Sequence, residues 1–113
     1  MKLSWKMLVA SHSWHLEVDD KARRQIDQLP LSSIRMTVFR AIQSLLVVDD
    51  HPRSVAGVKK LSGENNDGQW RMKQGFYLIL FDIEPGEVEH QGFTYKGIVR
   101  IRSVVHRRDA YRS

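Results

Sequence analysis

The chain has 113 residues, with 18 Lys and Arg against 13 Asp and Glu and no Cys. Its length favours one compact domain. The absence of Cys excludes thiolate metal sites, iron–sulfur clusters, thiol catalysis and disulfides. The longest apolar run, Phe76 to Phe81, is far shorter than the roughly 20 residues of a membrane span, so we expect a soluble, cytoplasmic protein without a membrane partner. A formal net charge of +5 favours a polyanionic partner.

The first half of the chain predicts one strand followed by two helices. Residues 1–11 lack the long apolar core of a secretory signal and are expected to form a loose N-terminal extension, which leaves 12–113 as a single domain. Trp14, Leu16 and Val18 alternate with polar residues, as in a strand with one buried face. Two amphipathic helices are expected next, with these apolar positions: Ala22, Ile26 and Leu29 in the first, and Ile34, Val38, Ala41, Ile42 and Leu45 in the second. Residues 49–68 show no sustained period and are expected to be irregular.

The second half predicts three strands. Strand character begins at Trp70, and after a turn at Gly75 the apolar run Phe76–Ile83 is typical of a central strand. A turn is expected at Glu84–Gly86, followed by an extended acidic hairpin tip, and Ile98–Val105 is expected to be the last strand. The order predicts an α+β fold, with a small antiparallel sheet of about four strands and both N-terminal helices packed on one face.

Strand alternation places cations on the other, open face of this sheet. Arg71 and Lys73 alternate with Trp70 and Met72, which we assign to the core, and Arg100 and Arg102 alternate with apolar residues in the last strand. Cations on adjacent strands repel one another unless an anion lies across them. The open face is therefore a candidate phosphate-binding surface.

The C-terminal segment adds to this basic character. From Lys96 to Ser113 it contains six cations and one carboxylate, with Tyr95 and Tyr111 interleaved. Guanidinium groups pair with phosphates and aromatic rings stack on bases, so this composition is typical of RNA-binding segments and also of a simple solvated tail.

Two segments resemble the RelE/ParE superfamily of bacterial toxin–antitoxin toxins. Trp70–Ile83 is similar to the family's signature strand pair: aromatic, basic, apolar, basic, any residue, Gly, any residue, Tyr, Arg, then an apolar run ending in an aromatic residue and an acid. Val105–Arg112 resembles the closing Gly-His-Arg-Arg-Asp-x-Tyr motif. The upstream segments Trp14–Val48 and Lys59–Gly63 resemble the remaining family elements, so that the resemblance covers residues 12–112.

The resemblance implies the toxin component of a toxin–antitoxin module, a ribosome-dependent mRNA endonuclease that inhibits translation without a metal or other cofactor. A 2′-hydroxyl would attack the adjacent phosphate, and cations would stabilise the charge that accumulates there. His106 is the best-suited proton-transfer group because an imidazole titrates near neutral pH, and Tyr111 suits the acid or a stacking role. The expected catalytic residues are Arg71, Lys73, His106, Arg107 and Tyr111, and the expected RNA-binding residues are Lys59, Lys60, Arg100, Arg102 and Arg108.

The expected partners are a cognate antitoxin, the ribosome and mRNA, and two alternatives remain open. Leu78 stands where the family carries the Arg after its signature Tyr, which favours a ParE-like inhibitor of DNA gyrase that cleaves nothing. The other alternative is a catalytically silent relative that retains antitoxin binding. No metal site is expected, because the His12 and His15 pair has no further ligand nearby in sequence.

Overall fold

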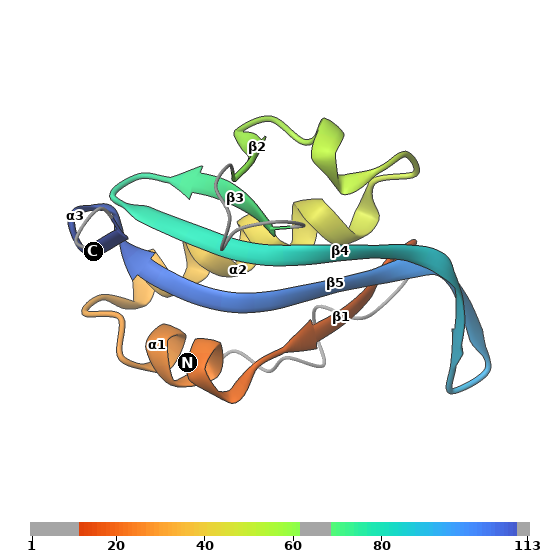
Figure 1. Ribbon diagram of the computed structural model, residues 1–113. Coiled ribbons are helices and arrows are strands. Elements are labelled where there is room, and N and C mark those ends of the chain that lie inside the picture. The colour runs from red at the N-terminus through yellow and green to blue at the C-terminus, as the bar shows by residue number, and fades with distance from the viewer. Residues whose placement is uncertain (1–11, 62–68, 111–113) are drawn as a thin grey trace.

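The structure is a computed structural model and describes residues 12–61 and 69–110 (Figure 1). The predicted N-terminal extension, residues 1–11, lies outside the described residues. The elements follow in this order: β1 (His15–Val18), α1 (Asp20–Asp27), α2 (Ser32–Val47), the short 3-10 helix η2 (Pro52–Ser54), β2 (Val58–Lys60), β3 (Gln69–Gln74), β4 (Tyr77–His90), β5 (Phe93–His106) and α3 (Arg107–Ala110). None of the described helices has the length and apolar character needed to cross a membrane.

The sheet has five strands in the order β1-β5-β4-β3-β2, so the prediction of about four strands was wrong. It is also mixed, because β1 pairs with β5 in parallel, whereas the other neighbours are antiparallel. Alternation along a strand reports which residues share a face but carries no information about the direction of the neighbouring strand. The parallel edge was therefore invisible in the sequence pattern.

The additional strand, β2, lies in the segment 49–68 that was predicted to be irregular. It has only three residues, which is too few for a period of two to be recognised. Its pairing with β3 supplies hydrogen-bond partners for backbone groups that the edge of β3 would otherwise leave exposed.

Strands β4 and β5 form a long hairpin that reaches beyond the rest of the sheet (Figure 1). The predicted turn at Glu84–Gly86 was wrong, since the chain continues through it as β4 with a register shift between Pro85 and Val88. The reversal occurs at Gln91 and Gly92, both with positive φ, as a two-residue hairpin turn requires. The last strand accordingly begins at Phe93, five residues before the predicted Ile98.

Both N-terminal helices contribute to one core with one face of the sheet. The buried cluster includes Ala22 and Ile26 from α1 and Val38, Ile42 and Leu45 from α2, the positions that the helical period predicted. The sheet contributes residues that face one another across the strands: Met72, Ile79 and Val104 in one row, and Phe81 and Ile101 in the next. Trp70 packs against this cluster, so the assignment of Trp70 and Met72 to the core is confirmed.

Candidate nucleic-acid interface

Three cations lie side by side on the open face, at the edge formed by β2 and β3. Lys59 is the cross-strand partner of Arg71, and Lys73 follows two residues later on β3, so all three point away from Met72 and the core. We call Lys59, Arg71 and Lys73 the cationic strip. Lys59 and Lys73 are exposed and Arg71 is half-buried. Among the described residues, no carboxylate forms an ion pair with the strip.

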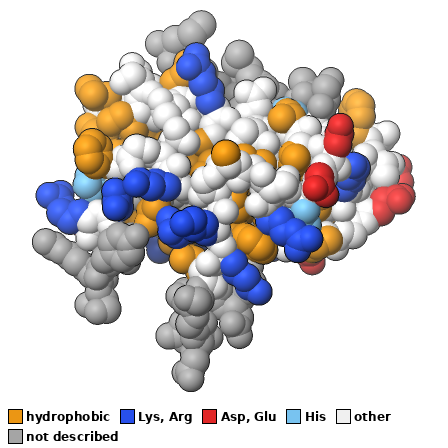
Figure 2. All heavy atoms as spheres, turned by 90° about the horizontal axis from the view of Figure 1, so that it is seen from above, with side chains coloured by type: hydrophobic (Ala, Val, Ile, Leu, Met, Phe, Trp, Pro, Cys, Tyr) orange, Lys and Arg blue, Asp and Glu red, His pale blue; other side chains and the backbone are white. Residues whose placement is uncertain are grey.

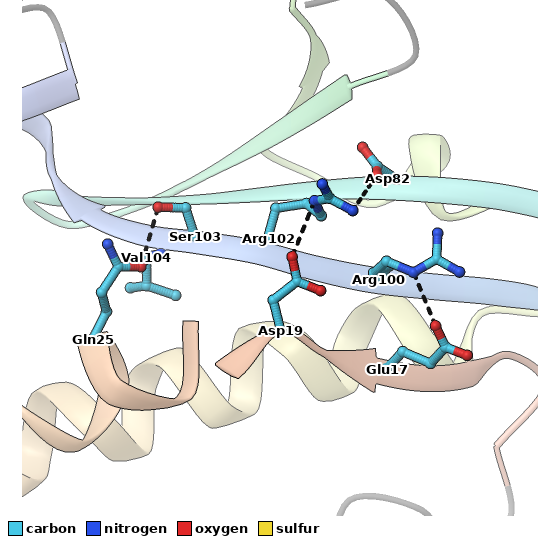
Figure 3. Close-up of polar contacts among 8 residues, drawn as sticks. All are labelled: Glu17, Asp19, Gln25, Asp82, Arg100, Arg102, Ser103 and Val104. Atoms are coloured by element: carbon cyan, nitrogen blue, oxygen red, sulfur yellow. Dashed lines mark hydrogen bonds and ion pairs between the residues drawn. The ribbon is translucent and has the colours of Figure 1, made fainter. Parts of the chain in front are cut away.

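Arg100 lies on the open face as predicted, but carboxylates from both neighbouring strands surround it. Its Nε donates to Glu17 Oε2 of β1 at 2.9 Å (Figure 3). Its Nη2 lies 3.6 Å from Glu84 Oε2 of β4. The hydrogen bond that Arg100 donates to the Glu17 carboxylate raises the pKa of Arg100 above its ordinary value. Its charge is thus matched within the molecule.

Arg102 is held in the same way. Its Nε lies 3.2 Å from Asp19 Oδ2, and its Nη1 lies 3.5 Å from Asp82 Oδ2 (Figure 3). Together the two arginines contribute +2 and their four carboxylates −4, so this part of the open face has a formal net charge of −2. A row of four free cations is therefore not formed, because the parallel edge strand brings in Glu17 and the adjoining Asp19.

Two further predicted RNA-binding residues, Lys60 and Arg108, and the predicted catalytic residue Arg107 are not part of the strip. Lys60 is exposed and pairs with Trp70, which places it on the opposite face from Lys59. Arg107 and Arg108 are exposed on α3, where Arg107 N–H donates to the Phe76 carbonyl of the β3–β4 turn. Tyr111 lies outside the described residues.

His106 is not brought onto the face that carries the cationic strip. It pairs with Tyr77, whereas Lys73 pairs with Leu78, the next residue of β4, and successive residues of a strand point to opposite faces. Its ring meets Tyr77 edge-on at 5.2 Å, and its Nδ1 accepts from Arg108 N–H at 3.1 Å. The strip and the imidazole therefore lie on the two sides of the same sheet end.

An aromatic pocket of about 230 Å³ opens on the His106 side, between α2 and the β3–β4 turn. Its lining includes apolar Ile34, Phe76 and Tyr77 and polar Ser33, Thr37 and Gln74. Phe76 is 71% exposed and its ring is parallel to that of His106, with centroids 6.1 Å apart. Sequence reasoning placed Phe76 in the central strand. The turn lies at Gly75 as expected, but it extends to Phe76, so this side chain lies outside the strand.

Three exposed glutamates lie at the opposite end of the molecule, toward the tip of the β4–β5 hairpin. Glu84, Glu87 and Glu89 are all exposed on the distal half of β4. In the face shown in Figure 2, Asp and Glu side chains lie toward the tip of the β4–β5 hairpin, and Lys and Arg side chains occur along the rest of it. The hairpin tip therefore carries negative charge and repels a polyanion. A polyanion is attracted instead to the end that carries the strip and α3.

His15 contacts two other aromatic rings. Its ring lies 4.4 Å from that of His90 and 5.2 Å from that of Tyr95, which fixes the hairpin against β1. Within residues 12–61 and 69–110, no three His, Cys, Asp or Glu side chains are placed to hold a metal ion together.

This ring cluster predicts a loss of stability in mild acid. Burial lowers the pKa of His15, the nearby His90 lowers it further, and Glu17 partly opposes them. A lowered pKa in the folded state means that the unfolded chain binds the proton more readily, so stability is full above the ordinary pKa of 6.5 and falls as pH decreases through it. We expect a lower urea midpoint at acidic than at neutral pH, and a shallower dependence in His15→Gln. An identical pH profile for that variant would contradict the contribution of His15.

Known proteins resemble this chain in structure but not detectably in sequence. No protein-family model and no curated protein sequence matches it. A chain in the crystal structure of the toxin–antitoxin complex RelBE2 from Mycobacterium tuberculosis has a TM-score of 0.50 and 20% identity, over 84% of this chain and 99% of that chain. A chain in the RelB–RelE antitoxin–toxin complex from Methanococcus jannaschii has a TM-score of 0.50 and 16% identity, over 84% and 94%. The α+β fold of this protein is thus one that also occurs in RelBE complexes.

Proposed function

We propose that this protein is the toxin of a toxin–antitoxin module and that, when free of its antitoxin, it cleaves mRNA on the ribosome in the cytoplasm. The observation that carries the proposal is the cationic strip, which lacks internal ion pairs among the described residues. The fold shared with chains of RelBE complexes supports the toxin–antitoxin assignment. The antitoxin would oppose the strip with carboxylates and so compete with RNA for the same charges.

In the proposed reaction the 2′-hydroxyl of one nucleotide attacks the adjoining phosphate and displaces the 5′-oxygen of the next. Arg71 and Lys73 bind that phosphate and stabilise the charge on its oxygens, a contribution of about 3 kcal/mol for each well-placed donor. The reaction also needs a base and an acid. Because His106 lies on the other side of the sheet end from Arg71 and Lys73, its imidazole does not act at the phosphate that they bind. In this proposal water accepts the 2′-hydroxyl proton and supplies the proton of the leaving 5′-oxygen.

The proposal is tested by adding the purified protein to a translating extract. We expect the message to be cut only in the presence of translating ribosomes. The upstream fragment should carry a 2′,3′-cyclic phosphate at its 3′ end. Arg71→Gln is expected to reduce the rate by 10²- to 10³-fold, as is usual when one donor to a developing oxyanion is lost. An intact message in the presence of folded protein would overturn the nuclease function.

A second candidate is a gyrase inhibitor that cleaves nothing. It is favoured by Leu78, which occupies the position opposite Lys73 and is only 3% exposed, so a buried aliphatic side chain takes the place of a guanidinium beside the strip. A DNA supercoiling assay run beside the translation assay separates the two candidates. Inhibition of gyrase with no effect on the message would favour this second function.

A further inference from the structure

The aromatic pocket on the His106 side has the features of a site for one nucleobase. A base is flat and aromatic, with hydrogen-bonding groups at its edge. The pocket offers the exposed face of Phe76 for stacking, and Gln74, Ser33 and Thr37 provide amide and hydroxyl groups at its wall. Its volume of about 230 Å³ is below the roughly 300 to 1,000 Å³ of pockets for drug-sized ligands, which favours a small occupant such as one base.

Two cations that follow His106 lie close to the Phe76 end of this pocket, outside its lining, and favour an anionic occupant. Arg107 is tied to the turn by the hydrogen bond from its N–H to the Phe76 carbonyl, and Arg108 N–H donates to His106 Nδ1. Both guanidinium side chains are exposed, and within residues 12–61 and 69–110 the ion pair of Arg108 is a long contact of 3.9 Å to Asp109. An aromatic face with adjacent guanidinium groups is the arrangement that binds an unstacked base together with its phosphate.

We infer that the aromatic pocket binds one unstacked base of a single-stranded RNA, with Phe76 as the stacking platform and Arg107 and Arg108 as ligands of the flanking phosphates. This inference rests on the proposed function and deepens it, because it names the RNA feature that is recognised. The RNA backbone would run along the cationic strip and around the β3–β4 turn, and one base would enter the pocket on the other side. The strip binds any sequence, whereas the pocket selects a base.

The test uses the intact protein and a single-stranded RNA decamer that contains the fluorescent base 2-aminopurine. We expect the fluorescence to be quenched on binding, as stacking requires. Phe76→Ala is expected to remove the quenching and to weaken binding about tenfold. Phe76→Tyr retains a ring face and is expected to keep both properties.

Phe93→Ala provides the matched control. Phe93 is also a surface phenylalanine next to a hairpin turn, with 67% exposure against 71% for Phe76, but it lies at the acidic end of the molecule. We expect no change in affinity or quenching. A decamer without bases separates stacking from charge. The wild-type protein should bind it about tenfold more weakly than the normal decamer. The Phe76→Ala variant should bind both decamers with equal affinity.

The outcomes distinguish this inference from the proposed function. If Phe76→Ala binds RNA like the wild-type protein, the base site is overturned while the toxin function stands. If that variant instead weakens only the complex with antitoxin, the pocket holds an antitoxin side chain, and the base site is likewise overturned. If the wild-type protein binds no RNA and leaves translation intact, both fail.

Discussion

Replacing Lys59, Arg71 and Lys73 together with Gln is expected to weaken the binding of single-stranded RNA on the order of 100-fold near 0.1 M salt. Each cation that contacts a phosphate releases about 0.7 counterion, so three lost contacts also make the plot of log K against log salt shallower by about 2 units. Fluorescence anisotropy with a labelled RNA over a range of salt concentrations measures both quantities. The two effects must occur together if the strip contacts the backbone.

The matched control removes the same charge elsewhere. Lys21 and Arg24 on α1 and Arg40 on α2 are exposed residues of the helices, and their joint replacement with Gln also lowers the net charge from +5 to +2. We expect RNA affinity to fall only slightly, because long-range attraction across the molecule is screened at this salt. A loss as large as that of the strip variant would mean that RNA responds to net charge alone.

Replacing Gly97 with Ala is expected to destabilise the protein by about 3 kcal/mol, near the upper end of the usual range for overpacking. Gly97 is buried in β5, and an added Cβ would lie 2.4 Å from the Glu84 carbonyl oxygen and 2.5 Å from a ring carbon of Trp14. The backbone oxygen belongs to the paired strand β4 and cannot move aside without breaking the ladder. Urea denaturation is expected to show this loss, and the Tm is expected to fall by roughly 10 to 20 °C.

Gly92→Asn is the comparison for this prediction. Gly92 has a φ of +83° in the hairpin turn, and no atom lies within 4 Å of the position that a Cβ would take. Asn tolerates this conformation better than other residues with a side chain, so we expect a cost below about 1 kcal/mol. A Gly97→Ala variant as stable as Gly92→Asn would show that Trp14 does not pack closely over β5.

The helices and the central strands could be predicted from local patterns. Ile26 in α1 and Ile42 in α2 each belong to a set of apolar residues at helical spacing, and both are fully buried. Met72 alternates with Arg71 and Lys73, and the structure places it on the core side of β3. These predictions succeeded because the side-chain period of a helix or a strand depends only on backbone geometry, and burial then selects the apolar face.

The charge state of the open face could not be predicted in this way. Arg100 and Arg102 point where alternation predicts, yet their partners Glu17 and Asp19 come from the other end of the chain. Only the parallel pairing of β1 with β5 brings these carboxylates within reach. The same holds for His106, because the register shift between Leu80 and Phe81 adds one residue to β5 after Ile101 and so moves His106 to the face opposite Arg100.

From the amino-acid sequence alone one could derive an α+β domain, its two amphipathic helices, most of its core and an excess of positive charge at one face. The tertiary structure alone decided which of those charges remain available: the cationic strip is free of carboxylates among the described residues, whereas Arg100 and Arg102 are neutralised. The physical reason is that periodicity reports the direction of each side chain relative to its own backbone. Electrostatic pairing depends on the distance between strands far apart in the chain, and no local pattern encodes that distance.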